Sequence, residues 1–143
     1  MNLKLRRWLL FIVWILITFY LSRQNGVESA QLSNGIADWL VRNLAKIGVF
    51  IETKTFGFYL RKTAHFMFHL VLAVLCYRAV RTTASSTWLS FAIALVISAA
   101  FAVINEVSQL FAAGRFATET DAFINLTGAA VGTILAVPSV REI

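Results

Sequence analysis

Residues 82–105 read TTASSTWLSFAIALVISAAFAVIN, a stretch without a charged side chain that ends at Glu106. About 20 mostly apolar residues are enough for a helix to cross the hydrocarbon core of a bilayer, so this stretch can span a membrane. The whole chain has the same character, because 59% of its 143 residues are hydrophobic, 14% are charged and its mean hydropathy is +0.74. Soluble domains carry about a quarter charged residues. We therefore expect an all-α membrane protein with a single domain over residues 1–143.

Three further apolar stretches precede or follow this one in the sequence. Residues 8–22 follow a basic N-terminus and lack the small-residue cleavage site of a signal peptide, so they predict a retained first span. Residues 63–77 need flanking residues to reach spanning length, and residues 122–140 contain Pro138, which would end the last helix. The sequence therefore predicts four transmembrane helices, at about residues 5–22, 58–80, 86–110 and 121–138.

The connection between the first two predicted spans carries a helical pattern. Its apolar side chains recur every three or four residues, namely Leu32, Ile36, Trp39, Leu40, Leu44, Ile47 and Ile51. Ser29 or Ser33 would cap the start of such a helix, and Gly48 would end it. We interpret residues 29–51 as an amphipathic helix that lies in the membrane interface. The alternative is a short soluble helix packed on the loop.

The basic residues indicate an orientation. The pI of about 10.1 reflects 13 Lys and Arg against 7 Asp and Glu, and in so apolar a chain these charges are typical of membrane flanks rather than of a nucleic-acid surface. Short flanks without acidic residues count most in setting topology. The residues in such short flanks are Lys4, Arg6, Arg7, Arg78, Arg81 and, next to Glu142, Arg141. We predict that both termini are cytoplasmic (N-in, C-in).

With that orientation, the unusual polar residues of the spans gather at the outer end of the bundle. They are Ser22, Gln24, Arg61, Lys62, His65, His69, Asn105, Glu106, Gln109, Arg115, Asp121 and Asn125. Lys62, His65 and His69 are three and four residues apart, so they share one helix face. Ionisable groups inside a span are costly unless they are paired or functional, so this cluster is the candidate site.

Three of these residues, His65, Glu106 and Asp121, are candidates for a catalytic role in proton transfer. The ordinary pKa of histidine, about 6.5, suits His65 to act as a general base. Each has a structural alternative: His65 hydrogen-bonded to Glu106, Glu106 ion-paired with a site arginine, and Asp121 in a capping box with Thr118. The sequence leaves both roles open for all three residues.

A second group of residues suits the binding of a phosphate. The substrate-binding candidates are the cations Arg61, Lys62 and Arg115 and the amides Gln24, Gln109 and Asn125. Arginine offers bidentate geometry to a phosphate, whereas the alternative role of these cations is to anchor helix ends at the interface. The alternative role of the glutamines is to form hydrogen bonds between helices.

Other chemistries are less favoured by the pattern. His65 and His69, four residues apart, would form a metal site together with Glu106 and Asp121, but we expect neither a metal nor a cofactor. A single cysteine, Cys76, excludes an intramolecular disulfide and a cysteine-based metal cluster.

The predicted fourth span contains a GxxxG pattern at Gly128 and Gly132. Two glycines at this spacing let another helix approach closely. The partner helix is either in the same chain or in a second copy, so the pattern leaves a homo-oligomer open.

Five short motifs follow one another along the chain. They are Ser22-x-Gln24, Arg61-Lys62-Thr-Ala-His65-Phe66, Asn105-Glu106-Val-Ser-Gln109, Gly114-Arg115 and Asp121-x3-Asn125-x2-Gly128-x3-Gly132. Their order and spacing, over about residues 20–135, resemble the VanZ-like family of bacterial membrane proteins. Two positions depart from that family: His69, where Tyr is more frequent, and Asn105, where Asp commonly precedes the Glu.

The resemblance implies a location and a range of functions. It implies a multi-pass protein of the bacterial cytoplasmic membrane, in which the predicted N-in, C-in orientation places the polar site on the outer side. Because the founding member is associated with teicoplanin resistance and the family has been linked to lipid-headgroup enzymes, it implies a protein that acts on or binds a lipid-linked phosphate headgroup or a cell-wall precursor. Three hypotheses remain open: a headgroup phosphoryl or headgroup transferase or hydrolase, a non-enzymatic lipid-binding protein, and a structural or partner-binding protein of the cell envelope.

Overall fold

The computed structural model describes residues 1–137 of the chain, and within that range it is helical and contains no strand. The helices follow one another as α1 (Leu3–Ser22), α2 (Gly26–Ala45), α3 (Thr53–Val80), α4 (Thr87–Ser108), the short 3₁₀ helix η1 (Gln109–Phe111) and α5 (Glu119–Ala136). This order confirms the all-α prediction. Pro138, Arg141 and Glu142, together with the predicted end of the last span at 138, lie outside the described residues.

Three segments are long and apolar enough to cross a membrane: α1, α3 and residues Thr87–Phe111, which comprise α4 and η1. The fourth predicted span is not confirmed, because α5 does not belong to this group. Its first turn carries Glu119 and Asp121, and its interior holds Asn125 and two glycines. These residues lower the apolar content of α5. Asn125, Gly128 and Gly132 are buried in the bundle, whereas Glu119 and Asp121 belong to the first turn of the helix.

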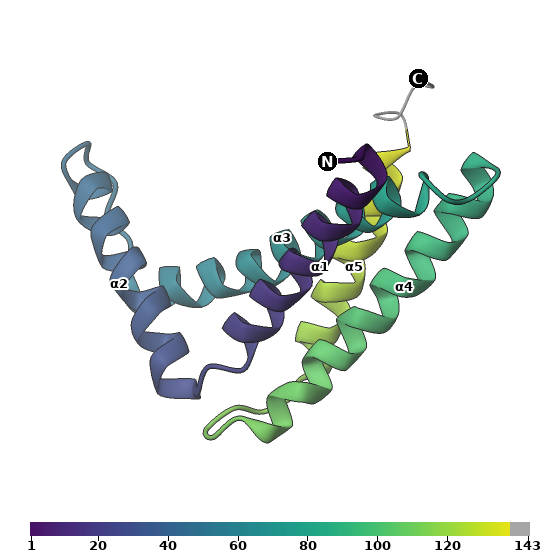
Figure 1. Cartoon of the computed structure of the whole chain (residues 1–143). Helices are drawn as coiled ribbons and strands as arrows, with labels where there is room; N and C mark the ends of the chain where they lie inside the picture. The colour runs from purple at the N-terminus through teal and green to yellow at the C-terminus, as the bar shows by residue number, and fades with distance from the viewer. Residues whose placement is uncertain (138–143) are drawn as a thin grey trace.

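Figure 1 shows that α1, α3, α4 and α5 form a bundle from which α2 projects, packed mainly on the first half of α3. The N-terminus, the α3–α4 connection and the end of α5 lie at one end of the bundle. The α1–α2 and α4–α5 connections lie at the other, which we call the polar end. Hydrogen bonds join the helices at both ends, from Arg7 Nη1 to the carbonyl of Arg78 (3.4 Å) and from Gln109 Nε2 to Ser22 Oγ (3.0 Å).

The closest packing in the bundle is between α3 and α5. A Cβ atom added at Gly128 would lie 2.4 Å from the carbonyl oxygen of Phe66, and one added at Gly132 would lie 2.2 Å from that of Leu70. Only glycine permits this approach of two backbones. The GxxxG pattern is therefore used within one chain, and a homo-oligomer, which stays a prediction, would need another surface.

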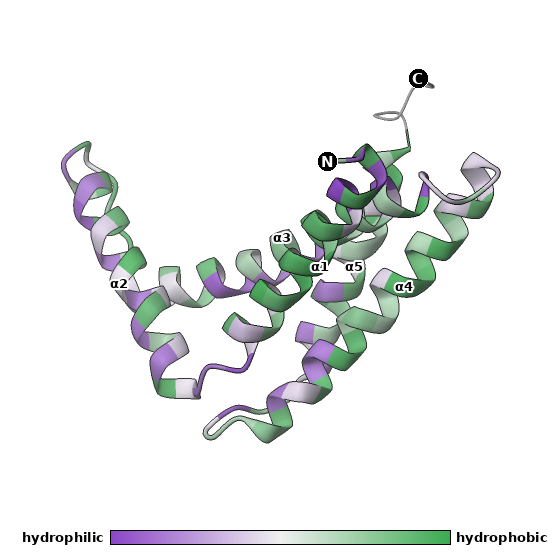
Figure 2. Cartoon of the chain, viewed as in Figure 1, coloured by the Kyte–Doolittle hydropathy of each residue, from purple (hydrophilic) through white to green (hydrophobic). Residues whose placement is uncertain are grey.

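The outer surface of the bundle is more apolar than its interior. Large side chains on α1 and α4 point outward, such as Leu16 (63% exposed) and Val96 (68% exposed), and Figure 2 shows the resulting hydrophobic faces. The buried residues include many small or polar ones, namely Ala73, Cys76, Ser90, Ala94, Ser98, Ala102, Ala129 and Thr133. Helices that meet lipid need no apolar interior and associate through small residues, so this distribution is typical of a membrane protein.

The predicted boundaries of α2 and α3 were wrong by several residues. The interfacial helix predicted at 29–51 begins earlier because Asn25, rather than Ser29 or Ser33, caps it: Asn25 Oδ1 accepts from the backbone N–H of Glu28 at 2.8 Å, and the Glu28 carboxylate accepts from the N–H of Asn25. The helix ends at Ala45, before the turn in which Gly48 has a φ of +84°.

The helix α3 starts five residues before its predicted start at 58. The side chain of Thr55 donates to the Glu52 carboxylate at 2.6 Å and thereby stabilises an additional first turn. The extension gives α3 a segment against which α2 packs. At their crossing a Cβ atom on Gly57 would meet Asn34 Oδ1 at 2.6 Å.

Candidate functional site

A contact between two glycines fixes the geometry of the polar end. Gly26, at the start of α2, donates its N–H to the carbonyl of Ala113 at 3.0 Å, and a Cβ atom on Gly26 would lie 2.2 Å from the carbonyl oxygen of Gly114. Gly114 itself has a φ of +69°, a conformation that glycine adopts without strain. The α4–α5 loop is therefore held against the start of α2, with Arg115 directly after the contact.

Arg115 connects this loop to two helices. Its Nε donates to Gln109 Oε1 at 3.2 Å, and its Nη1 donates to Ser29 Oγ at 2.7 Å. Burial lowers the pKa of the Arg115 guanidinium, and the nearby charge of Arg61 lowers it further, while Glu106 opposes both. An arginine side chain nevertheless stays protonated in a protein, so Arg115 brings a positive charge to the site.

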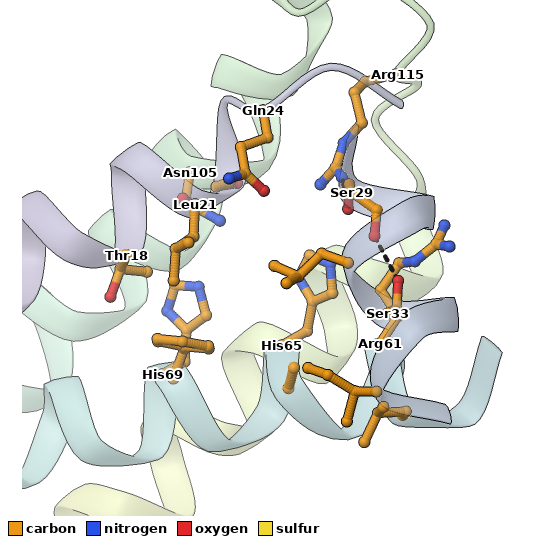
Figure 3. Close-up of a pocket in the computed structure, with 16 residues that line it drawn as sticks. Thr18, Leu21, Gln24, Ser29, Ser33, Arg61, His65, His69, Asn105 and Arg115 are labelled. Carbon is orange, nitrogen blue, oxygen red and sulfur yellow. Dashed lines mark hydrogen bonds between the residues drawn. The ribbon is translucent and has the colours of Figure 1, made fainter. Parts of the chain in front are cut away.

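A cavity of about 270 Å³ lies between α1, α2 and α3, beside the ends of α4 and of the α4–α5 loop (Figure 3). One part of its lining is polar and consists of Thr18, Ser22, Gln24, Ser29, Ser33, Arg61, His65, His69, Asn105 and Arg115. The other part is apolar and consists of Leu21, Leu32, Ile36, Leu60, Ala64 and Phe68. The cavity can therefore hold a molecule with an anionic group and a hydrocarbon part.

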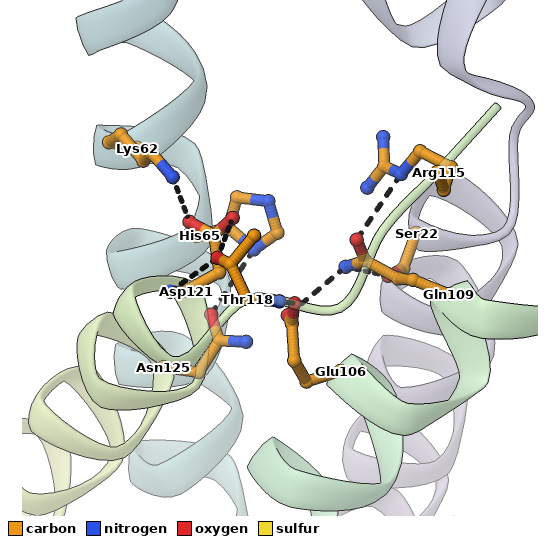
Figure 4. Close-up of polar contacts among 9 residues, drawn as sticks. All are labelled: Ser22, Lys62, His65, Glu106, Gln109, Arg115, Thr118, Asp121 and Asn125. Atoms are coloured by element: carbon orange, nitrogen blue, oxygen red, sulfur yellow. Dashed lines mark hydrogen bonds and ion pairs between the residues drawn. The ribbon is translucent and has the colours of Figure 1, made fainter.

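His65 projects from α3 into this cavity, and Asn125 of α5 orients its ring. Its Nδ1 lies 3.2 Å from Asn125 Oδ1 (Figure 4). Because a carboxamide oxygen only accepts, this contact places the proton of a neutral imidazole on Nδ1 and leaves Nε2 as the acceptor. The structural alternative from the sequence, a hydrogen bond from His65 to Glu106, is wrong, because His65 contacts the amide of Asn125 instead.

Glu106 and Asp121 instead hold together the start of α5 (Figure 4). Thr118 caps this helix by accepting from the N–H of Asp121 at 3.1 Å, and its hydroxyl donates to Asp121 Oδ2 at 2.9 Å. The N–H of Thr118, however, donates to Glu106 Oε1 at 2.8 Å, so a residue of α4 replaces the second half of the predicted capping box. Asp121 is thereby left to bind Lys62 Nζ across the α3–α5 interface at 2.5 Å.

The structure divides the predicted site residues into two sets. Gln24, Arg61, His65 and Arg115 line the cavity. The others do not line the cavity but form hydrogen bonds with each other, with lining residues or with the start of α5: Lys62, Glu106, Gln109, Asp121 and Asn125. Lys62 binds Asp121 across the α3–α5 interface, and its role as a phosphate ligand stays a prediction.

Sequence reasoning missed two residues of α2 as parts of the site. Ser29 and Ser33 line the cavity, although the sequence indicated them as helix caps. They are four residues apart and lie on the same face as Leu32 and Ile36, which also line the cavity. The spacing of Ser29 and Ser33 could have indicated this role, because it places two hydroxyl groups on the apolar face of an amphipathic helix.

The two arginines of the cavity have no carboxylate partner within residues 1–137, where the structure contains a single salt bridge, Lys62–Asp121. Arg61 Nε is buried and forms no hydrogen bond with any described residue. In the same part of the chain, no three His, Cys, Asp or Glu side chains are placed to hold a metal ion. The ligand chemistry available here is that of two guanidinium groups, two imidazoles and several hydroxyls and amides.

Comparison with known proteins agrees with the motif pattern. The sequence model of the VanZ/LLP1 family matches residues 7–140, nearly the whole chain. No match is found among curated proteins or among solved structures.

Proposed function

This chain belongs to the VanZ/LLP1 family, and we propose that it binds a lipid phosphate in the cavity between α1, α2 and α3. The observation that carries the proposal is the pair of guanidinium groups, Arg61 and Arg115, in a half-buried cavity without a carboxylate partner among the described residues. A partly buried charge is costly when it is left uncompensated. A phosphate would compensate both charges and accept the bidentate hydrogen bonds that arginine offers.

The apolar part of the cavity supports a lipid over a free phosphate. Leu32 and Ile36 of α2 and Leu60 of α3 line the same space as the arginines. Both α2 residues are also about half exposed on the outside, at 51% and 47%, so a hydrocarbon chain that leaves the cavity would stay in contact with apolar surface. Burial of such a chain is favourable by about 0.8 kcal/mol for each CH₂ group.

The proposal includes a topology. In it α5 is the fourth span, both termini are cytoplasmic and the polar end faces the outer leaflet of the bacterial cytoplasmic membrane. The observation behind α5 is that it returns from the polar end to the end at which the N-terminus lies (Figure 1). In the same arrangement α2 lies in the interface, with Trp39 (62% exposed) toward the headgroups and acyl chains.

Lipid binding is testable with the full chain in detergent. Native mass spectrometry with dioleoyl phosphatidic acid as the probe should show bound lipid on the wild type, and Arg61→Gln together with Arg115→Gln should weaken binding about tenfold or more, as expected for the loss of two charged hydrogen-bonding groups. The matched control is Arg78→Gln with Arg81→Gln, which makes the same charge change at the opposite end of the bundle. Equal loss in both double variants, or none in either, contradicts the proposal.

A second candidate function is catalysis at the bound phosphate, favoured by the orientation of His65. With Nδ1 held by Asn125, Nε2 would take the proton of an attacking water or alcohol, whose oxygen forms a bond to phosphorus as the bond to the headgroup alcohol breaks. His65 would then return the proton to the departing alcohol, while the two arginines hold the phosphate charge. Release of a labelled headgroup by the wild type, abolished in His65→Ala with lipid binding retained, is the expected result; no turnover by the wild type leaves a binding protein.

The same proposal connects the site to the envelope process that the family resemblance implies. A protein that binds or alters phosphate-bearing lipids or lipid-linked precursors at the outer leaflet acts where a lipoglycopeptide antibiotic such as teicoplanin inserts. Expression of the wild type should raise teicoplanin tolerance, and the Arg61 and Arg115 double variant should not. If tolerance instead follows substitutions at Trp39 on the exposed stripe of α2, the protein acts through a partner rather than through the cavity.

A further inference from the structure

The deep end of the cavity contains two buried polar side chains that the phosphate proposal does not use. His69 on α3 is 1% exposed, and neither of its ring nitrogens forms a hydrogen bond with a described residue. Asn105 on α4 is 2% exposed, and its Oδ1 likewise has no partner within residues 1–137. Both side chains line the cavity, at the end away from Arg61 and Arg115 (Figure 3).

These atoms indicate a ligand because buried polar groups are nearly always hydrogen-bonded. A neutral imidazole offers one donor and one acceptor, and the Asn105 oxygen offers a further acceptor. A pure hydrocarbon placed against them would exclude water and leave all of these groups unpaired, which opposes binding. A ligand with oxygen atoms at this depth would satisfy them.

Resting on the proposed lipid-phosphate site, we infer that the ligand is a glycerolipid phosphate, with ester or hydroxyl oxygens of its glycerol backbone bound at His69 and Asn105. The competing class is a polyisoprenoid phosphate, in which only hydrocarbon follows the phosphate. The two classes present similar phosphate groups to Arg61 and Arg115 and differ in the part of the lipid that follows the phosphate. The deep end of the cavity therefore decides between them.

The spacing along α3 fits this assignment. His65 and His69 are one helical turn, about 6 Å, apart, and Arg61 lies about 6 Å on the other side of His65. A phosphate between Arg61 and His65 leaves one turn of α3 to the deep pair, which is the region that the glycerol backbone follows in a glycerolipid. The acyl chains then contact the apolar lining beside the deep pair, where Leu21 lies (Figure 3).

The experiment is a competition between two lipids for the purified full-length chain. Dioleoyl phosphatidic acid and undecaprenyl phosphate, both phosphate monoesters, are offered together, and the bound ratio is read by native mass spectrometry. The wild type should prefer phosphatidic acid by about tenfold or more, since the wrong lipid leaves buried polar groups unpaired. His69→Phe and Asn105→Leu should each bring the ratio to within about threefold of one, because an apolar side chain removes that penalty.

Two further variants separate recognition from folding. His69→Gln retains a donor and an acceptor and should keep most of the preference for phosphatidic acid. Met67→Phe introduces the same aromatic ring on the same helix, at a position 47% exposed to the outside, and should leave the ratio unchanged. Thermal unfolding of each variant in detergent identifies those that fold, and Asn105→Leu supplies the result if His69→Phe does not.

The outcomes distinguish this inference from the function on which it rests. Equal binding of the two lipids by the wild type, a preference for undecaprenyl phosphate, or a preference that survives in both His69→Phe and Asn105→Leu overturns the inference and leaves the phosphate site standing. Equal binding is also the result expected if water alone satisfies His69 and Asn105. If neither lipid binds, or if Arg61→Gln with Arg115→Gln binds both as well as the wild type, the phosphate site itself fails.

Discussion

The interface between α3 and α5 and the cavity between α1, α2 and α3 use the same helix in opposite ways. On the α5 side, α3 meets Gly128 and Gly132 backbone to backbone, and its one charged contact, Lys62 with Asp121, is paired. On the cavity side, Arg61 and His69 have buried nitrogen atoms without hydrogen-bond partners among residues 1–137. On the α5 face Asn125 Nδ2 is also buried without a partner among residues 1–137, but the charge of Lys62 is paired there. On the cavity face the charge of Arg61 has no carboxylate partner among those residues. This difference is the strongest indication that the cavity is the functional region.

The interface with α5 should be the more sensitive of the two to added volume. We predict that Gly132→Leu destabilises the protein by about 3 kcal/mol or more, because its Cβ would lie 2.2 Å from the Leu70 carbonyl oxygen and overpacking forces the backbones apart. The measurement is the thermal midpoint in detergent. Gly35→Leu, in α2 with nothing within 4 Å of the added Cβ, is the control and should change the midpoint little. An unchanged midpoint in Gly132→Leu would show that α3 and α5 do not pack in this way.

Removing a support of the α5 start should have a smaller effect on stability. Glu106→Ala takes the acceptor from the N–H of Thr118 and from Gln109 Nε2, so we expect a loss of about 1–3 kcal/mol, the cost of losing hydrogen bonds to a charged group. Binding of phosphatidic acid should fall only as far as folding does. The control is Glu119→Ala, an exposed carboxylate in the first turn of α5.

The same variant separates the two roles that the sequence left open for Glu106. If Glu106→Ala unfolds at the wild-type temperature but loses headgroup turnover, Glu106 takes part in catalysis and is not a support. If stability falls and turnover per folded molecule is retained, the structural role is correct.

Local patterns predicted the helices and gathered the site residues at one end of the bundle, but not the pairings inside the site. Apolar periodicity indicates where a helix exists, so α1 and α4 lie close to their predicted ranges. Which carboxylate meets which cation depends instead on the rotation of α5 about its axis, and that rotation is set by Gly128 and Gly132 against α3. The pairing of Lys62 with Asp121 is an example, because no local pattern around either residue indicates it.

The start of α2 has a local and a distant determinant. The local one is the capping box of Asn25 and Glu28, which lies before the apolar stripe that predicts the helix. The distant one is the contact of the Gly26 backbone with Ala113 and Gly114. No local signal near residue 26 indicates that contact. Ser29 was therefore interpreted as a cap, although it lies one turn inside the helix and binds Arg115.

The smallest predicted effect tests that reassignment of Ser29. In Ser29→Ala, Arg115 loses the hydrogen bond of 2.7 Å from Nη1 but keeps the one from Nε to Gln109, so the guanidinium stays in the cavity with more freedom. We expect phosphatidic acid to bind about three- to tenfold more weakly, the range for one ordinary hydrogen bond, because the guanidinium keeps its bond to Gln109, with an unchanged thermal midpoint. Ser33→Ala is the matched control, because Ser33 Oγ donates to the backbone of its own helix at Ser29 and lines the same cavity. Equal weakening in both variants would mean that the cavity responds to loss of any hydroxyl, and no weakening in either would mean that Ser29 does not position Arg115 for the phosphate.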